Sequence, residues 1–424
     1  MSPRNYFSFT PLLPSPTCGT VEARSIVEPI RNIIKKKNGQ IQFREAECVK
    51  IDATNKKVIC HSNDDTVLGK TEIFLDYNYL VIATWAQVNT FNTSGVIGHC
   101  HFLKEVEDAQ KIRRSVISCF EKADLPNNLV RITVVQFGDH ILNMFGERVS
   151  TFAEHKFQRD GIKVKTECRV LGVSEKEIVV KVKSEGIVSS IPYGMVVWSA
   201  GTGTRHVIRN FMEQIGQSKR RFLATDEWLR VEGCDSVYAL GDCATIHQRK
   251  VMEDISTIFS AADKDNSGTL TVKEFQDVIK DILVKYPQLE LYLKNKHLRS
   301  AKDLLKDSQG NDMKEVAAQH GTYLARCFNH MEEYKTSPEG PLRFKESGRH
   351  QFRPFRYKHF GQFAPLGGEQ TAAELPGDWV SMGHRSQWLW YSVYLSKQVT
   401  WHTRVLVVSD WTRRFIFGRD SSCI

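Results

Sequence analysis

Residues 236–244 read Ser-Val-Tyr-Ala-Leu-Gly-Asp-Cys-Ala, a short apolar run that passes directly into a glycine and a carboxylate. A short apolar run bounded by turn residues predicts a buried strand. Gly241 allows close backbone approach, and the carboxylate of Asp242 can accept hydrogen bonds from sugar-like hydroxyl groups. On these residues alone, an ordinary turn at the end of a strand remains the alternative.

The same pattern of short apolar runs and turns extends over residues 40–245. Strands are predicted at residues 58–60, 79–83, 132–136, 179–182, 195–198 and 236–240. Helices are predicted between them at residues 103–121 and 149–159. This alternation predicts an α/β fold with layers of helices and strands and with small antiparallel inserts.

Length and composition bound the class of protein. A chain of 424 residues is long enough for two or three domains, and 41% apolar with 25% charged residues is typical of folded soluble proteins. The formal charge of +9 comes from scattered basic residues, which argues against a nucleic-acid-binding strip. Ten cysteines without a CxxC pair predict reduced thiols. The opening residues MSPRNYFSFTPLLPSP show neither a signal core nor an Arg-rich presequence.

The most specific motif is the twelve-residue stretch DKDNSGTLTVKE at residues 263–274. It matches the calcium-binding loop of an EF-hand, which takes oxygen ligands at positions one, three, five, seven, nine and twelve and a glycine at six. The predicted calcium ligands are Asp263, Asp265, Ser267, Thr269, Thr271 and Glu274, with Gly268 at the turn. An acidic surface turn is the alternative. A second candidate loop at residues 307–312 is degenerate, so an unpaired, modulating hand is expected.

The C-terminal tail combines aromatic and basic residues. One helical face would carry Trp401, Val405, Val408, Thr412 and Phe415. Arginines at 404, 413 and 414 lie among them, and further aromatics stand at 388, 390, 391, 394 and 411. Amphipathic aromatic residues with arginines suit an anionic membrane surface, whereas packing of a C-terminal helix on the core is the alternative.

Together, residues 9–31, 89–113, 237–244, the calcium loop and residues 412–422 resemble the external, calcium-binding type II NAD(P)H dehydrogenases of plant mitochondria. The resemblance implies a disulfide-reductase-like flavoprotein with two dinucleotide-binding domains. It implies transfer of a hydride from NADH or NADPH to FAD and of electrons to ubiquinone, without proton pumping. It also implies a peripheral protein of the mitochondrial inner membrane that faces the intermembrane space. A homodimer is left open, and the last residues, 422–424, leave a peroxisomal address as a minor alternative.

The resemblance also divides the chain. It implies a partial FAD-binding domain at residues 1–95, a partial NAD(P)H-binding domain at 96–224 and a return to the FAD-binding domain at 225–249. An EF-hand insert would follow at 250–315, a FAD and quinone-site segment at 316–380 and membrane-anchoring helices at 381–424.

Site residues carry over motif by motif. Flavin contacts are implied for Thr10, Pro11, Leu12, Ser25, Ala83, Gly241 and Asp242, and NAD(P)H contacts for Gly201, Gly203 and Arg205. Gln136 falls where the family reads the adenine ribose, and a neutral amide there favours NADPH. Gln319 matches the second glutamine of the family's quinone-site helix, while Glu315 stands in place of the first. Each of these residues also fits a structural role in a loop, a strand end or a solvated helix.

The chain departs from the family at the phosphate-binding turns. It contains no GxGxxG, and it opens downstream of the first such turn, while residues 125–129 run directly into the strand that follows the second. A further deletion is inferred at residues 313–316, and Trp85 replaces a glycine turn. Because each missing unit also carries a strand, we expect low stability or aggregation. A non-catalytic, truncated calcium-binding protein at the membrane is therefore the competing hypothesis.

Overall fold

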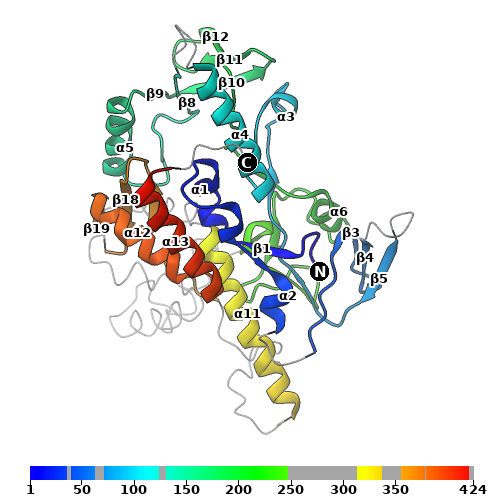
Figure 1. Ribbon diagram of the computed structural model, residues 1–424. Coiled ribbons are helices and arrows are strands. Elements are labelled where there is room, and N and C mark those ends of the chain that lie inside the picture. Colours follow the sequence, from blue (N-terminus) through cyan, green and yellow to red (C-terminus); the bar gives the residue numbers. More distant parts are fainter. Residues whose placement is uncertain are drawn as a thin grey trace, which may run out of the picture.

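The computed structural model describes residues 1–35, 40–62, 71–123, 130–246, 313–336, 355–377 and 379–419. These residues form a mixed α/β structure in which the central strands are covered by helices (Figure 1). Residues 247–312, with the predicted calcium loop, lie outside the described residues.

The parallel strands form pairs. They are β6 (Leu80–Ile82) with β15 (Val237–Ala239), β14 (Leu223–Thr225) with β16 (Ala244–Ile246), and β8 (Thr133–Val135) with β9 (Lys163–Lys165). Within the described residues every parallel sheet has two strands. On β6, Ile82 is buried whereas Val81 is 41% exposed, although inner strands of parallel sheets are ordinarily buried on both faces. That strands are missing beside β6 stays a prediction.

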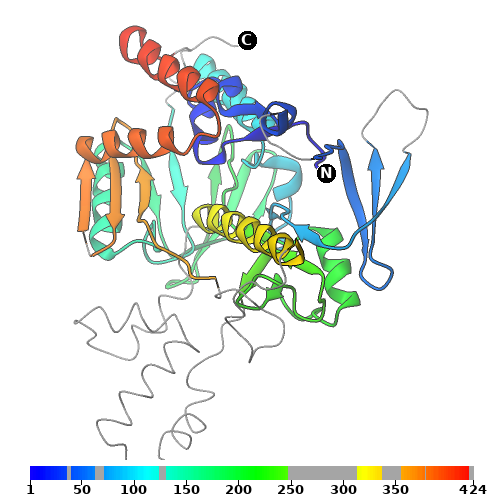
Figure 2. The same ribbon diagram turned by 90° about the horizontal axis from the view of Figure 1, so that it is seen from below.

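The predicted antiparallel inserts are confirmed. One consists of β3 (Ala46–Asp52), β4 (Lys57–Ser62) and β5 (Glu72–Asp76), and the other of β10 (Cys168–Val173), β11 (Glu177–Val182) and β12 (Val188–Pro192). Figure 2 shows the first projecting from one side of the molecule. The side chains of β5 alternate between more and less exposed, as expected for a strand with one solvated face.

The helices cover these strands. They are α1 (Pro14–Thr17), α2 (Ile30–Lys35), α3 (Val96–His99), α4 (Val106–Ala123), α5 (Glu147–Arg159), α6 (His206–Gln214) and α11 (Met313–Thr336). Asp108 caps the start of α4, because its Oδ2 accepts from the N–H groups of Lys104 and Glu105 at 3.1 and 3.0 Å. The helix α6 buries Ile208, Phe211 and Met212 in the core cluster that contains Ile82 and Val237.

The C-terminal region forms a small antiparallel sheet and two helices. The elements are β17 (Gln362–Pro365), β18 (Thr371–Leu375), β19 (Trp379–Gly383), α12 (His384–Ser396) and α13 (Trp401–Phe417). Val149 and Ala153 of α5 pack against Ala364 and Ala372 of the sheet, which lies beside α5 in Figure 2. Thr400 caps α13 by accepting from the N–H of Thr403.

Short elements connect these layers. They are β1 (Tyr6–Ser8), β2 (Val27–Pro29), β7 (Gln87–Val88), β13 (Thr202–Gly203), η1 (Thr10–Leu12), η2 (Ala23–Ile26) and η3 (Gly241–Cys243).

The strand predicted at residues 195–198 is wrong. Val197 makes only an isolated bridge to His101, because a strand needs a neighbouring ladder and the described residues provide none there. No described helix is long and apolar enough to cross a bilayer.

Candidate functional site

Two of the predicted cofactor-binding stretches meet at one edge of the β6–β15 pair. The N–H of Leu240 donates to the carbonyl oxygen of Ile82 at 2.9 Å, and the thiol of Cys243 points to the same oxygen at 3.6 Å. Ala83 therefore lies beside Gly241 and Asp242, where the carboxyl ends of both strands emerge. In open α/β sheets, ligands bind in the crevice outside the carboxyl ends of the strands.

Gly241 is required by the geometry of this edge. Its φ is +70°, in the left-handed region that favours glycine, and an added Cβ would lie 3.2 Å from the Cβ of Ala317. The backbone N–H of Gly241 donates to Nδ1 of His320 at 3.4 Å. The glycine turn after β15 thus lets α11 pack closely against the site.

His320 is the polar group of α11 that faces this turn, and the sequence analysis assigned it no role. The residue is buried, and burial lowers the pKa of its imidazole to about 4, so the ring is neutral near pH 7. Because Nδ1 accepts from Gly241, the ring proton is assigned to Nε2, which is buried and has no hydrogen-bond partner among the described residues. The spacing of Ala317 and His320, three residues apart on one helix face, was the available signal.

Gln319, the predicted quinone-site residue, is held by the backbone of the neighbouring segment. Its Nε2 donates to the carbonyl oxygen of Lys358 at 2.7 Å, and its Oε1 accepts from the N–H of Lys358 at 2.9 Å. Phe355, at the start of the same segment, also contacts α11, and its ring meets the His320 ring edge-on at 4.5 Å between centroids. Gln319 and His320 together fix the segment that begins at residue 355 against α11.

The predicted NAD(P)H-contacting residues form a second group. Gly203 and Thr202 pair with Gln87 and Val88 across the antiparallel β7–β13 ladder. Gly201 has φ +76°, and an added Cβ would lie 2.7 Å from the ring of Phe91. Gly201 is therefore required by close packing of its segment on Phe91, whereas a Cβ at Gly203 would lie at an ordinary contact distance of 3.5 Å from the Gln87 side chain.

Arg205 and Trp85 meet at the end of the same ladder. The Nε of Arg205 donates to the carbonyl oxygen of Trp85 at 2.9 Å. The Trp85 side chain is 40% exposed. The bulky Trp85 side chain is thus accommodated at the surface, and its backbone is hydrogen-bonded to Arg205.

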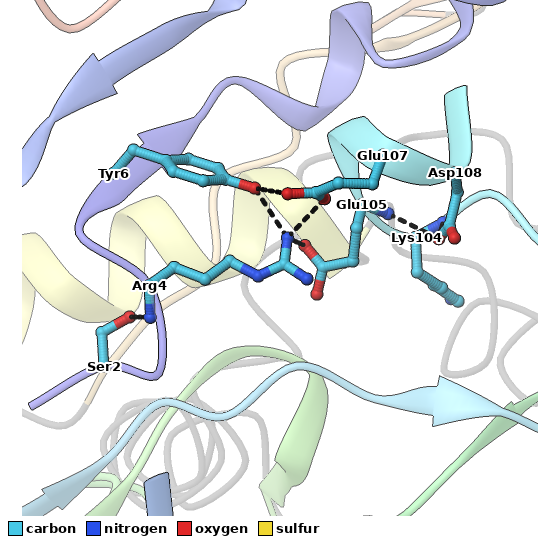
Figure 3. Close-up of polar contacts among 7 residues, drawn as sticks. All are labelled: Ser2, Arg4, Tyr6, Lys104, Glu105, Glu107 and Asp108. Atoms are coloured by element: carbon cyan, nitrogen blue, oxygen red, sulfur yellow. Dashed lines mark hydrogen bonds and ion pairs between the residues drawn. The ribbon is translucent and has the colours of Figure 1, made fainter. Parts of the chain in front are cut away.

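A polar cluster joins the first strand to the start of α4, as Figure 3 shows. Nη1 of Arg4 lies 2.7 Å from Oε2 of Glu105, 2.9 Å from Oε2 of Glu107 and 2.7 Å from the Tyr6 hydroxyl, which donates to Glu107 at 2.8 Å. Burial and the hydrogen bond to Glu107 raise the pKa of Tyr6 to about 12. Burial also raises the pKa of Glu105, against the charges of Arg4 and Arg205. Glu105 therefore interacts with the positive charges of both Arg4 and Arg205.

The remaining predicted residues have mainly structural surroundings. Leu12 of η1 is fully buried in a core cluster with Trp390 and Val407. Thr10 of η1 and Ser25 of η2 are also buried. The carbonyl oxygen of Gln136 accepts from the N–H of Cys168 at 2.9 Å. These contacts position the backbone, and any contact with a cofactor stays a prediction.

The residues present fit one end of a flavin nucleotide. Ala83, Gly241, Asp242 and His320 gather at the strand edge, where a buried N–H donor lacks a partner and a glycine permits close approach. The pyrophosphate end is different, because a GxGxxG turn with its row of N–H groups is absent from the whole sequence. For calcium, the predicted ligands at 263–274 lie outside the described residues, which themselves hold no cluster of three or more metal-ligating side chains.

Comparison with known proteins identifies the family. Residues 2–262 match the pyridine nucleotide-disulphide oxidoreductase family, and residues 359–420 match the NDH2 C-terminal domain. The chain is 59% identical to the mitochondrial external alternative NAD(P)H-ubiquinone oxidoreductase B1 of Solanum tuberosum, over all of this chain and 86% of the relative. The chain belongs to the type II alternative NAD(P)H-ubiquinone oxidoreductases. It is also 57% identical, over 100% of this chain and 86% of the relative, to the B1 protein of Arabidopsis thaliana.

The type II oxidoreductase fold is confirmed by a solved structure. The NDH2 of Plasmodium falciparum in complex with NADH matches with a TM-score of 0.83 and 26% identity, over 99% of this chain and 94% of that one. The alignment with the Solanum relative spans 494 positions against 424 residues here, so 494 less 424, or 70, positions of the relative have no counterpart. The relative therefore carries residues that this chain lacks.

Proposed function

We propose that this type II oxidoreductase oxidises NADH or NADPH and passes the electrons to ubiquinone, with FAD as its bound redox group. The observation that carries the proposal is the edge at which Ala83, Gly241, Asp242 and His320 meet. When bound, FAD supplies the hydride and electron chemistry, and the protein supplies binding and orientation. The names of the relatives give NAD(P)H and ubiquinone as the substrates of those proteins.

The side chains at the edge have separate tasks in this proposal. The carboxylate of Asp242 accepts hydrogen bonds from ribityl hydroxyl groups, as a carboxylate beyond a buried strand can do. The buried Nε2–H of His320 donates to an acceptor atom of the ligand, since the Gly241 N–H occupies Nδ1. Gln319 holds the segment at Lys358 against α11, the helix at which ubiquinone is proposed to bind.

The tail supports docking to a membrane surface. Trp401 and Phe415 are 76% and 86% exposed, and Val405, Val408 and Thr412 on the same face of α13 are exposed as well. By contrast, Trp390, Tyr391, Tyr394 and Trp411 pack in the core cluster between the two helices and the N-terminal segment. Large apolar side chains in water favour burial among lipid chains, so this face of α13 is proposed to lie in the membrane interface.

Calcium and location complete the proposal. The EF-hand loop at residues 263–274 would bind calcium. Because it is a single, unpaired EF-hand, it would modulate the activity of the redox domain. The mitochondrial names of the relatives favour the mitochondrion, with the protein peripheral on the inner membrane and facing the intermembrane space. The proposal also includes a homodimer, which a measurement of the oligomeric state in solution would test.

Reduction of a ubiquinone analogue by NADH or NADPH, with FAD added and with or without calcium, tests the proposal. Asp242→Ala should abolish activity, while the control Asp235→Ala, at an exposed carboxylate after the preceding turn, should not change it. Absence of flavin-dependent activity in folded, calcium-binding protein would instead support the truncated, non-catalytic hypothesis.

A further inference from the structure

A basic cavity lies between the loop after α1, the middle of α4 and the end of α13. Its volume is about 200 Å³, and four arginines line it together with two carboxylates: Arg113, Arg413, Arg414, Arg419, Glu22 and Asp410. The lining therefore has two more cations than carboxylates, and one of the cations, Arg414, is also paired with Glu369 next to the cavity. A surplus of guanidinium groups around a hollow of this size is suited to a phosphate group, which guanidinium binds in bidentate fashion.

The two carboxylates are largely occupied by contacts that build the cavity wall. Nη2 of Arg413 lies 2.6 Å from Oε1 of Glu22, and Oδ2 of Asp410 accepts from the backbone N–H of Glu22 at 2.9 Å. The hydrogen bond from Arg413 lowers the pKa of Glu22 against the effect of burial. These contacts hold the loop against α13, so the wall is preformed.

Arg414 and Arg419 line the cavity as well. Arg414 pairs with Glu369 and donates to the Tyr391 hydroxyl at 3.2 Å. Burial lowers the pKa of Arg414, and the nearby charge of Arg419 lowers it further. Two guanidinium groups that repel each other gain from an anion bound between them.

The cavity opens beside the apolar end of α13. Phe417 lines it, and Phe415, Ile416 and Phe417 are all largely exposed. A lipid whose chains contact these side chains would present its phosphate at the level of the arginines, as in interfacial helices with basic flanks. Soluble phosphates do not account for the apolar side chains at the mouth.

We propose that this cavity binds the phosphate group of an anionic phospholipid and so orients the protein on the membrane. The inference rests on the proposed docking of α13. It adds a specific headgroup site, built from Arg113, Arg413, Arg414 and Arg419, to a docking surface that would otherwise act through apolar contact alone.

The test is co-sedimentation of the full chain with vesicles of phosphatidylcholine alone and of phosphatidylcholine with phosphatidylglycerol. Arg113→Gln and Arg419→Gln should each lower partitioning onto the anionic vesicles about fivefold and leave partitioning onto phosphatidylcholine unchanged. Arg114→Gln, the neighbour of Arg113 on α4 outside the cavity, is the control of equal charge. Arg419→Lys keeps the charge and should still weaken binding, because it loses the guanidinium fork. Thermal unfolding should show that the variants are folded.

The outcomes separate the site from the docking surface. Equal losses for Arg114→Gln and Arg113→Gln would overturn the site, since net charge would then explain the binding. If the parent chain shows no preference for vesicles with phosphatidylglycerol but binds inorganic phosphate at low concentration, the cavity is a free-phosphate site and the lipid assignment is overturned. No binding of the parent chain to either vesicle would overturn the site together with the proposed docking of α13.

Discussion

The backbone N–H of Gly241 donates to Nδ1 of His320 at 3.4 Å, and this contact joins the carboxyl end of β15 to the middle of α11. The two residues are 79 positions apart, and the intervening chain includes the predicted calcium insert. The proposed flavin edge and the predicted quinone-site helix therefore share a partly buried polar contact. A change in the position of α11 would be felt directly at the Gly241–Asp242 turn.

His320 should make stability depend on pH. Its folded pKa, about 4, lies below its ordinary value of 6.5, so the unfolded chain binds more protons between these values. The stabilisation is therefore complete above pH 6.5 and is lost as the pH falls toward 4, by up to about 3 kcal/mol. Urea unfolding across this range should show the loss.

The matched variants isolate this effect. His320→Gln keeps an acceptor for Gly241 and removes the titration, so the slope of unfolding free energy against pH should flatten. His384→Gln, at an exposed position at the start of α12, should keep the parent slope. Identical slopes for His320→Gln and the parent protein would contradict the assignment of a buried, neutral imidazole.

The Arg4 cluster should contribute to stability. Arg4→Met removes the partner of Glu105 and Glu107 and leaves a half-buried carboxylate unpaired, so we expect a loss of about 1 kcal/mol after allowing for solvent screening. Lys57→Met, which breaks an exposed pair with Asp76 at 3.8 Å, should cost less than about 0.5 kcal/mol. Equal effects in urea unfolding would show that the cluster acts only as a surface ion pair.

Strand β6 offers two neighbouring side chains with opposite expectations. Ile82 is buried in the core cluster, and Ile82→Ala should destabilise the chain by about 3 kcal/mol. Val81 is exposed, so Val81→Lys should leave the unfolding free energy nearly unchanged and reduce aggregation in light scattering, because a charge disfavours strand pairing at an open edge. A large destabilisation by Val81→Lys would show that this face is covered after all.

Several helices and strands could be predicted from local sequence patterns, because their formation depends mainly on residues close in the sequence. The strand expected at residues 79–83 is β6, and the helix expected at residues 149–159 is the main part of α5. The prediction of a strand at residues 195–198 was wrong because a strand there would need a pairing strand from elsewhere in the chain, and Val197 forms only an isolated bridge to His101. The sheet β17–β19 was missed, since its short strands lie among glycines and prolines and gain order from packing on α5.

The candidate site was predicted in part. Gly241 and Asp242 followed from the residue order after an apolar run, and the structure places them beside Ala83 through strand pairing. The role of His320 could not be predicted, because its burial and its contact with Gly241 arise from the approach of α11 across a long sequence separation. The bonds between Gln319 and Lys358 depend on the same packing.

The two faces of the C-terminal helices should respond differently to substitution. Phe415→Ser should lower partitioning onto vesicles about tenfold or more and leave stability unchanged, since the ring is almost fully exposed in the folded chain. Trp390→Ala should instead destabilise the fold by about 3 kcal/mol or more, because this ring is buried beside Tyr391, Tyr394 and Trp411. Vesicle flotation and thermal unfolding measure the two effects, and a stability loss with Phe415→Ser would contradict the assignment.

The most direct test of the proposed function is the visible absorbance spectrum of the purified full chain, recorded with added FAD after removal of free flavin. We expect a bound flavin band that NADH or NADPH bleaches, and a weaker band in Asp242→Ala than in Asp235→Ala. A folded, monodisperse chain that retains no flavin would contradict it, because the edge formed by Ala83, Gly241, Asp242 and His320 would then be insufficient to hold the cofactor without the missing phosphate-binding turns.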